Sequence, residues 1–232
     1  ANVYGPVSVK VYGGSVKRTD VEGSGGVYGA NNVNGAPKST VTVDIYGTDV
    51  SANNEYALYA VYGGGNKADY IYDGYPTVKV YGCDNSIEYV YGGGNAAAVK
   101  ATDITIWGGN TIGNVFGGGN GTISPANVSG DTNVKIFGGS ITNVYGGSNN
   151  QGSIGGNLKV NILSQAEPEK EICPLLRANV YAGGNKAASK VGILNIGCTG
   201  ENGRIENIYG GANQADIEGN IDLHINSGNI GN

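Results

Sequence analysis

A six-residue motif recurs along the chain and constrains its fold more than any other feature. The motif is an aliphatic residue, an aromatic residue, two glycines, a variable residue and an asparagine. Close copies occupy residues 61–66, 90–95, 115–120 and 144–149, and looser copies occupy 27–31, 180–185 and 208–213. Its aromatic residues recur every 24 to 36 residues. Such self-similarity is typical of repeat proteins, in which each repeat must stack on its neighbours to bury its apolar side.

A second element precedes each copy and alternates between aliphatic and polar residues. Five clear copies end in an aromatic residue and cover residues 9–12, 43–46, 78–81, 104–107 and 134–137. Three later copies keep the alternation but lack the aromatic residue, and they cover residues 160–163, 194–197 and 223–226. Alternation with a period of two indicates a half-buried strand, with the aliphatic residues facing inward. By the same parity, the aromatic residue that follows the strand faces outward.

Two strands and a shorter stretch after each asparagine, as at 95–99, 149–154 and 213–217, indicate a three-sided coil. Glycine supplies 43 of the 232 residues but does not recur at every third position, which excludes collagen. We therefore predict an all-β protein, a right-handed parallel β-helix forming a single-stranded solenoid of about seven to eight rungs. A β-prism and a propeller are the alternatives, and propeller blades of about 40 or more residues fit the period less well.

The whole chain, 1–232, is expected to form a single repeat domain. Residues 2–5 and 229–232 match interrupted copies of the repeat, which suggests a fragment of a longer chain.

The charge balance argues against several classes of partner. The chain carries 14 basic and 19 acidic residues, for a net charge of −5. Proteins that bind nucleic acid usually present clustered Lys and Arg, and none is found here. No apolar run approaches the roughly 20 residues of a membrane span. We expect no nucleic-acid partner, no membrane insertion, no metal and no cofactor.

Three stacked columns are expected along the coil. The asparagines after the glycines should form a hydrogen-bonded structural ladder. Its expected members are Asn66, Asn95, Asn120, Asn149, Asn185 and Asn213. Two aromatic columns follow from the strand ends, and stacking of their rings on one another is favoured over contact with sugars. For the second column, the sequence does not decide whether the aromatic side chains face inward or outward. Tyr145 facing outward is preferred, but the spacing between Ile141 and Val144 then requires a corner between them; otherwise the aromatic residues face inward.

Insertions between strands supply the candidate ligand site, because loops on a rigid scaffold often carry function. The candidate ligand-binding cluster is Tyr56, Tyr59, Tyr70, Tyr72 and Tyr75, with loop sealing as the structural alternative. Cys173 lies in the long insertion of the sixth rung, and Cys198 lies in the seventh. A Cys173–Cys198 disulfide is therefore predicted for an exported protein, and free buried thiols are the alternative.

The repeat, with its preceding strand, resembles glycine-rich parallel β-helix repeats of bacterial cell-surface and secreted adhesin-like proteins, in the pectate-lyase-like fold group. The resemblance covers nearly the whole chain and implies an extracellular or cell-surface location. It also implies attachment to glycans or host-surface components. Because no converging carboxylates are found in the repeat columns, we expect a non-enzymatic adhesin-like or scaffold domain. The alternative is a polysaccharide lyase or glycoside hydrolase domain.

Overall fold

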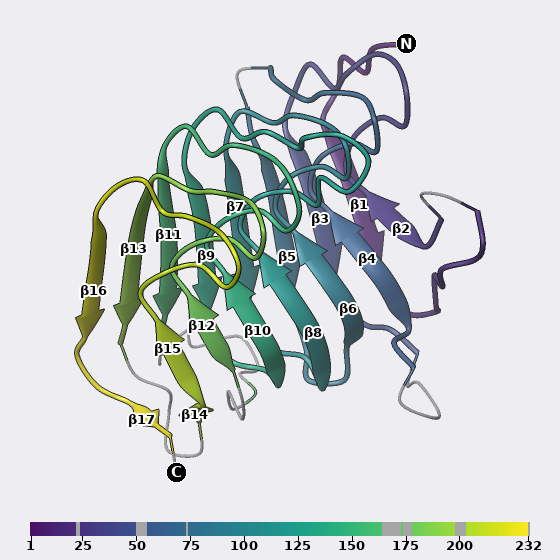
Figure 1. The fold of residues 1–232 in the computed structure, drawn as a ribbon. Coiled ribbons are helices and arrows are strands. Elements are labelled where there is room, and N and C mark those ends of the chain that lie inside the picture. The colour runs from purple at the N-terminus through teal and green to yellow at the C-terminus, as the bar shows by residue number, and fades with distance from the viewer. Residues whose placement is uncertain are drawn as a thin grey trace.

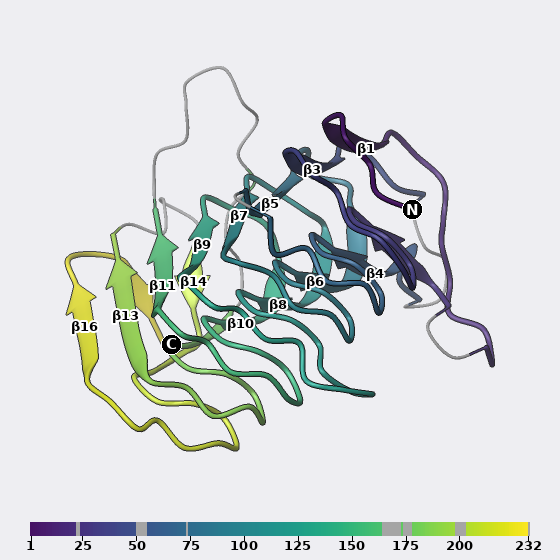
Figure 2. The same cartoon turned by 90° about the horizontal axis from the view of Figure 1, so that it is seen from above.

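The computed structural model describes residues 1–21, 24–49, 55–72, 74–163, 173, 178–197 and 203–231. These residues contain β-strands and no helix. The strands alternate between two long parallel sheets that face each other across the core (Figure 1). The segments that lead from the second sheet back to the first lie beside one another at one end of the strands (Figures 1 and 2).

The first sheet has eight strands, which pair in chain order without exception. They are β1 (Val7–Val11), β3 (Val41–Ile45), β5 (Pro76–Val80), β7 (Thr102–Ile106), β9 (Thr132–Ile136), β11 (Asn157–Ile162), β13 (Val191–Ile196) and β16 (Ile221–Ile225). Their register keeps equivalent repeat positions side by side, as in the Val11–Ile45 pair. The alternating segments of the sequence are thus strands, and the prediction of this element is confirmed.

The second sheet has seven strands, and each ends in the aromatic residue of the motif. They are β2 (Gly26–Tyr28), β4 (Leu58–Tyr62), β6 (Ser86–Tyr91), β8 (Thr111–Phe116), β10 (Ile141–Tyr145), β12 (Asn179–Tyr181) and β15 (Asn207–Tyr209). A separate pair joins β14 (Arg204–Ile205) to β17 (Asn229–Ile230). The predicted third stretch is present as isolated bridges that link Tyr70, Val99, Val128 and Ile154.

The main core lies between the two sheets and consists of stacked aliphatic columns. Val43, Val78 and Ile104 from the first sheet pack with Val61, Val90 and Val115 from the second. A smaller cluster includes Tyr70 and Val99, which pack with residues at the beginnings of first-sheet strands, such as Val41 of β3. Because every pass of the chain supplies the same residue types at the same positions, the core continues from one repeat to the next.

The aromatic column of the first sheet faces away from the core, as predicted. Tyr12, Tyr46, Tyr81, Trp107 and Phe137 stack in order with nearly parallel rings. Tyr12 is 71% exposed, whereas Trp107 is buried. Their parallel stacking supports the structural interpretation of this column.

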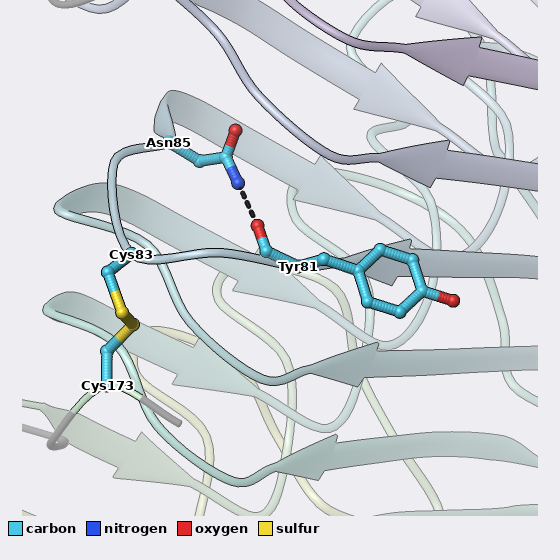
Figure 3. Close-up of a disulfide and its surroundings, with 4 residues drawn as sticks. All are labelled: Tyr81, Cys83, Asn85 and Cys173. Atoms are coloured by element: carbon cyan, nitrogen blue, oxygen red, sulfur yellow. Dashed lines mark hydrogen bonds between the residues drawn. A yellow bond between two sulfur atoms is a disulfide. The ribbon is translucent and has the colours of Figure 1, made fainter. Parts of the chain in front are cut away.

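The predicted Cys173–Cys198 disulfide is wrong in this structure, because Cys173 bonds to Cys83 instead. Figure 3 shows this bridge at the corner after β5, where Asn85 also donates a hydrogen bond to the carbonyl of Tyr81. The backbone of Cys173 donates to Trp107 O and accepts from Gly139 N. Cys173 therefore lies close to the ends of β7 and β9, although in the chain it comes later, between β11 and β12. Cys198 lies outside the described residues.

Candidate functional site

The strands of the second sheet bend, and this bend decides which residues face outward. Ile141 and Val144 are both fully buried in the main core although they are three residues apart. Thr142 and Asn143, between them, are exposed and half-buried. The strand therefore turns a corner at these two residues, which is one of the two solutions that the sequence leaves open. Tyr145 then faces away from the main core, as preferred.

The outward aromatic residues in the middle of the second sheet, from Tyr62 to Tyr181, are nevertheless buried, whereas Tyr28 is half-buried and Tyr209 is exposed. Their rings stack along the sheet with centroids 4.5–5.1 Å apart. The stack contains Tyr28, Tyr62, Tyr91, Phe116, Tyr145, Tyr181 and Tyr209. Because each ring covers its neighbour's face, Tyr62, Tyr91 and Tyr145 are each less than 5% exposed. The stack can present ring edges to a ligand, but its faces are occupied.

An asparagine ladder runs along one side of this aromatic stack. Each side-chain amide donates to the amide oxygen of the preceding member, over distances of 2.7–3.1 Å. The ladder contains all six predicted asparagines, from Asn66 through Asn95, Asn120, Asn149 and Asn185 to Asn213. It begins one step earlier at Asn32, which accepts from Asn66.

A second asparagine ladder lies on the other side of the stack, and the sequence analysis missed it. Asn143 donates to Asn114, Asn179 to Asn143, and Asn207 to Asn179. These residues stand two positions before the aromatic residue of each later motif copy. Comparison of that position across the copies would have revealed the ladder. In β6 the same column is occupied by Tyr89.

Tyrosine hydroxyls tie the stack to the first ladder. Tyr62 donates to Asn95 Oδ1 at 3.3 Å, and Tyr91 donates to Asn120 Oδ1 at 3.2 Å. Desolvation by burial is the main factor that raises the pKa of Tyr62 and of Tyr91 well above the ordinary tyrosine value. The two hydroxyls therefore stay protonated at neutral pH and keep donating to the ladder.

Two further tyrosines lie outside the stack and offer more of their surface. Tyr59 and Tyr89 meet edge to face with centroids 5.5 Å apart. The Arg18 guanidinium lies 5.1 Å from the centroid of the Tyr59 ring and donates to its hydroxyl at 2.9 Å. Both tyrosines are half-buried. They form the aromatic wall of a depression next to the stack.

That depression, here called the trough, has two adjoining compartments. The C-terminal compartment has a volume of about 310 Å³ and is lined by Tyr59, Tyr89, Tyr91, Asn114, Phe116, Asn120, Thr122, Asn149, Asn150, Asn185 and Lys186. The N-terminal compartment has a volume of about 180 Å³ and is lined by Arg18, Ser24, Tyr28, Tyr59, Tyr62, Asn95, Asn120, Thr122 and Ile123. Tyr59, Asn120 and Thr122 belong to both. The lining combines tyrosine and phenylalanine with amides, hydroxyls and two basic side chains.

The structure separates the predicted tyrosine cluster. Only Tyr59 lines the trough. Tyr70 is fully buried and donates to Ser39 O at 2.7 Å, so it belongs to the core. Tyr72 and Tyr75 are 44% and 49% exposed, and Lys38 lies over the ring of Tyr72. Tyr56 is half-buried. Its pKa is raised mainly by desolvation and further by the nearby charge of Glu88.

Asn120 is the most connected member of the ladder, and its loss should be costly. It donates to Asn95, and its oxygen accepts from Asn149, Asn150, Thr122 and Tyr91. Asn120→Ala is expected to lower the free energy of unfolding by about 2–3 kcal/mol, because several partly buried donors lose their acceptor. Urea unfolding measured by circular dichroism tests this.

Asn213→Ala is the matched control, because Asn213 is exposed and makes one ladder bond, to Asn185. Its expected cost is below about 1 kcal/mol. Equal unfolding midpoints for the two variants would show that the ladder contributes no stability at its centre.

Comparison with models of known protein families finds no match. Searches of curated proteins and of solved structures also find no similar protein. Within the described part of the chain, no helix is long and apolar enough to cross a membrane. No three His, Cys, Asp or Glu side chains gather into a metal-binding group among those same residues. The trough is therefore the feature of this chain from which a function can be inferred.

Proposed function

We propose that this chain is a non-enzymatic, extracellular adhesin-like or scaffold repeat domain that contacts polysaccharide through the trough. We further propose that its two sheets are walls of a right-handed parallel β-helix of about seven to eight rungs. The alternation of strands between two parallel sheets supports this architecture. The Cys83–Cys173 disulfide supports export, since disulfides persist mainly in oxidising compartments.

The trough is the single observation that carries the binding proposal. Carbohydrate rings present apolar faces and many hydroxyl groups, so they suit sites that combine aromatic walls with amides. Tyr59 and Tyr89 supply the aromatic wall. Ladder residues such as Asn120 and Asn185 add amide groups to the lining, and Thr122 adds a hydroxyl. A solvent-open trough with this lining favours a hydroxyl-rich ligand over an apolar one.

A binding and turnover assay on the same protein tests the proposal. Xylan, mixed-linkage β-glucan and polygalacturonate are probed by affinity electrophoresis, and released reducing sugar is measured in parallel. We expect retarded migration on at least one polysaccharide without release of reducing ends. Release of reducing ends would instead support the lyase or hydrolase alternative, and no binding to any polysaccharide or on a glycan array would overturn the proposed function.

Tyr59→Ala is expected to weaken polysaccharide binding about tenfold, which is a loss of about 1.4 kcal/mol, because it removes the wall shared by both compartments. Tyr72→Ala and Tyr75→Ala are matched controls, since both tyrosines are exposed and line neither compartment. Binding that depends on Tyr72 or Tyr75 and not on Tyr59 would place the site at the loop cluster instead.

A further inference from the structure

We propose that the trough binds one linear glycan lengthwise, across both compartments at once, so that affinity depends on chain length. This inference rests on the proposed function and specifies the shape and placement of its ligand. The ligand is an internal stretch of an unbranched chain, and it passes the junction of the two compartments, here called the waist, where Tyr59, Asn120 and Thr122 line both.

The direction of the trough follows from the strands that supply its lining. The N-terminal compartment takes Tyr28 from the end of β2 and Tyr62 from the end of β4. The C-terminal compartment takes Phe116 from β8, and it extends to Asn185, which follows β12. Because these strands pair in that order, the trough crosses the strands instead of following one of them. A compact ligand would contact only part of this length.

The length of the trough is set by the spacing of the strands. Five ring-to-ring steps lead from Tyr28 to Tyr181, and neighbouring parallel strands lie about 4.8 Å apart, so the trough spans roughly 24 Å. Its polar groups repeat at this same spacing, because the ladder contributes one amide from each of four successive repeats, from Asn95 to Asn185. A regular row of amides fits a polymer that presents hydroxyl groups at regular intervals.

The waist makes the two compartments one site. Thr122 is exposed, donates to Asn120 Oδ1 at 3.0 Å and accepts from Asn150 Nδ2 at 2.9 Å. Tyr59 and Asn120 are the other two side chains that line both compartments. A chain that fills one compartment must pass these shared residues to reach the other. Once it does, its second half binds as an intramolecular event, which raises affinity without any new type of contact.

Each compartment has one basic residue that does not line the other, so the contribution of each compartment can be measured. Arg18 lines the N-terminal compartment and contacts the ring and hydroxyl of Tyr59. Lys186 lines the C-terminal compartment and is exposed. Each has a matched control outside the lining: Lys17, which is paired with Glu55, and Lys67, which follows ladder residue Asn66 as Lys186 follows Asn185. Substitution of either Arg18 or Lys186 should weaken binding of the same long chain.

The experiment uses xylo-, cello- and galacturono-oligosaccharides, from the monosaccharide to the decasaccharide, titrated by calorimetry. We expect one long oligosaccharide per protein molecule. We also expect affinity to rise by about 10–100-fold between the shortest and the longest oligomers that bind. Arg18→Ala and Lys186→Ala should each weaken the longest oligomers more than the shortest, and Lys17→Ala and Lys67→Ala should change neither.

Thr122→Trp tests the waist directly. A bulky side chain at this exposed position should abolish the length dependence while short oligomers still bind, and Thr122→Val controls for the lost hydroxyl. Two short oligomers bound per molecule without length dependence would overturn this inference and leave polysaccharide binding intact. Length dependence that survives Thr122→Trp would overturn it as well. Binding of no polysaccharide or oligosaccharide is a different result, because it removes the proposed function itself.

Discussion

Breaking the Cys83–Cys173 disulfide lowers the free energy of unfolding by about 2–4 kcal/mol, the largest single loss we expect from removing one covalent bond. The bridge joins residues 90 positions apart, so it removes much of the conformational freedom of the unfolded chain. In the folded chain it fixes Cys173 beside Trp107 and Gly139, with which its backbone makes hydrogen bonds. The comparison is urea unfolding with and without reductant.

Three variants separate the bridge from the side chains that form it. Cys83→Ser, Cys173→Ser and the double variant should show the same loss, because each breaks one and the same bond. Cys198→Ser should keep the oxidised stability. Peptide mapping that finds Cys173 bonded to Cys198, or titration of three free thiols in the unreduced, denatured protein, would contradict the structure's pairing.

The sequence predicts the parts of this fold that repeat. The strand pattern, the outward column from Tyr12 to Phe137 and the asparagine ladder each come from one residue type at one recurring position. Parallel pairing in register converts that recurrence into stacking, so identical positions meet. The second ladder was equally visible in principle, since Asn143 and Asn179 hold the same position in their motif copies.

Features that depend on a single residue or a single insertion could not be predicted in this way. The spacing of Ile141 and Val144 fits two backbone paths, and only the bend of β10 places both in the core. Cys173 sits in an insertion without periodicity, so its contact with Cys83 leaves no signal in the repeat. Tyr70 and Tyr72 are two residues apart, yet one is core and the other is exposed.

The trough also departs from the repeat, which explains why the sequence placed the candidate site elsewhere. Tyr89 occupies a column that becomes asparagine in β8, β10, β12 and β15. Tyr59 lies at a β4 position where the next strand has Glu88, and Arg18 precedes β2; Tyr59 and Arg18 meet only in three dimensions. A candidate binding site therefore forms where the tyrosines interrupt an otherwise regular surface.

Gly117→Ala should cost about 3 kcal/mol, because its new methyl group has no space. A Cβ at Gly117 would lie 2.2 Å from the carbonyl oxygen of Gly146 and 3.0 Å from Cβ of Thr132. The first contact is with the backbone of the next repeat, which cannot move without disturbing the parallel pairing of β8 and β10. The measurement is the urea midpoint of the variant against that of the unmodified protein.

Gly210→Ala is the control from the same column, where a Cβ would meet only Ile221 Cγ2, at 3.3 Å. We expect a change within about 0.5 kcal/mol there.

The column also contains Ala182 in place of glycine, and the residue that faces it is Gly192, whose Cβ would lie 2.9 Å from that of Ala182. Gly192→Ala should therefore destabilise, and adding Ala182→Gly should restore most of the loss. If the double variant loses as much free energy of unfolding as the two single variants added together, close packing between Ala182 and Gly192 is not the reason for glycine at this position.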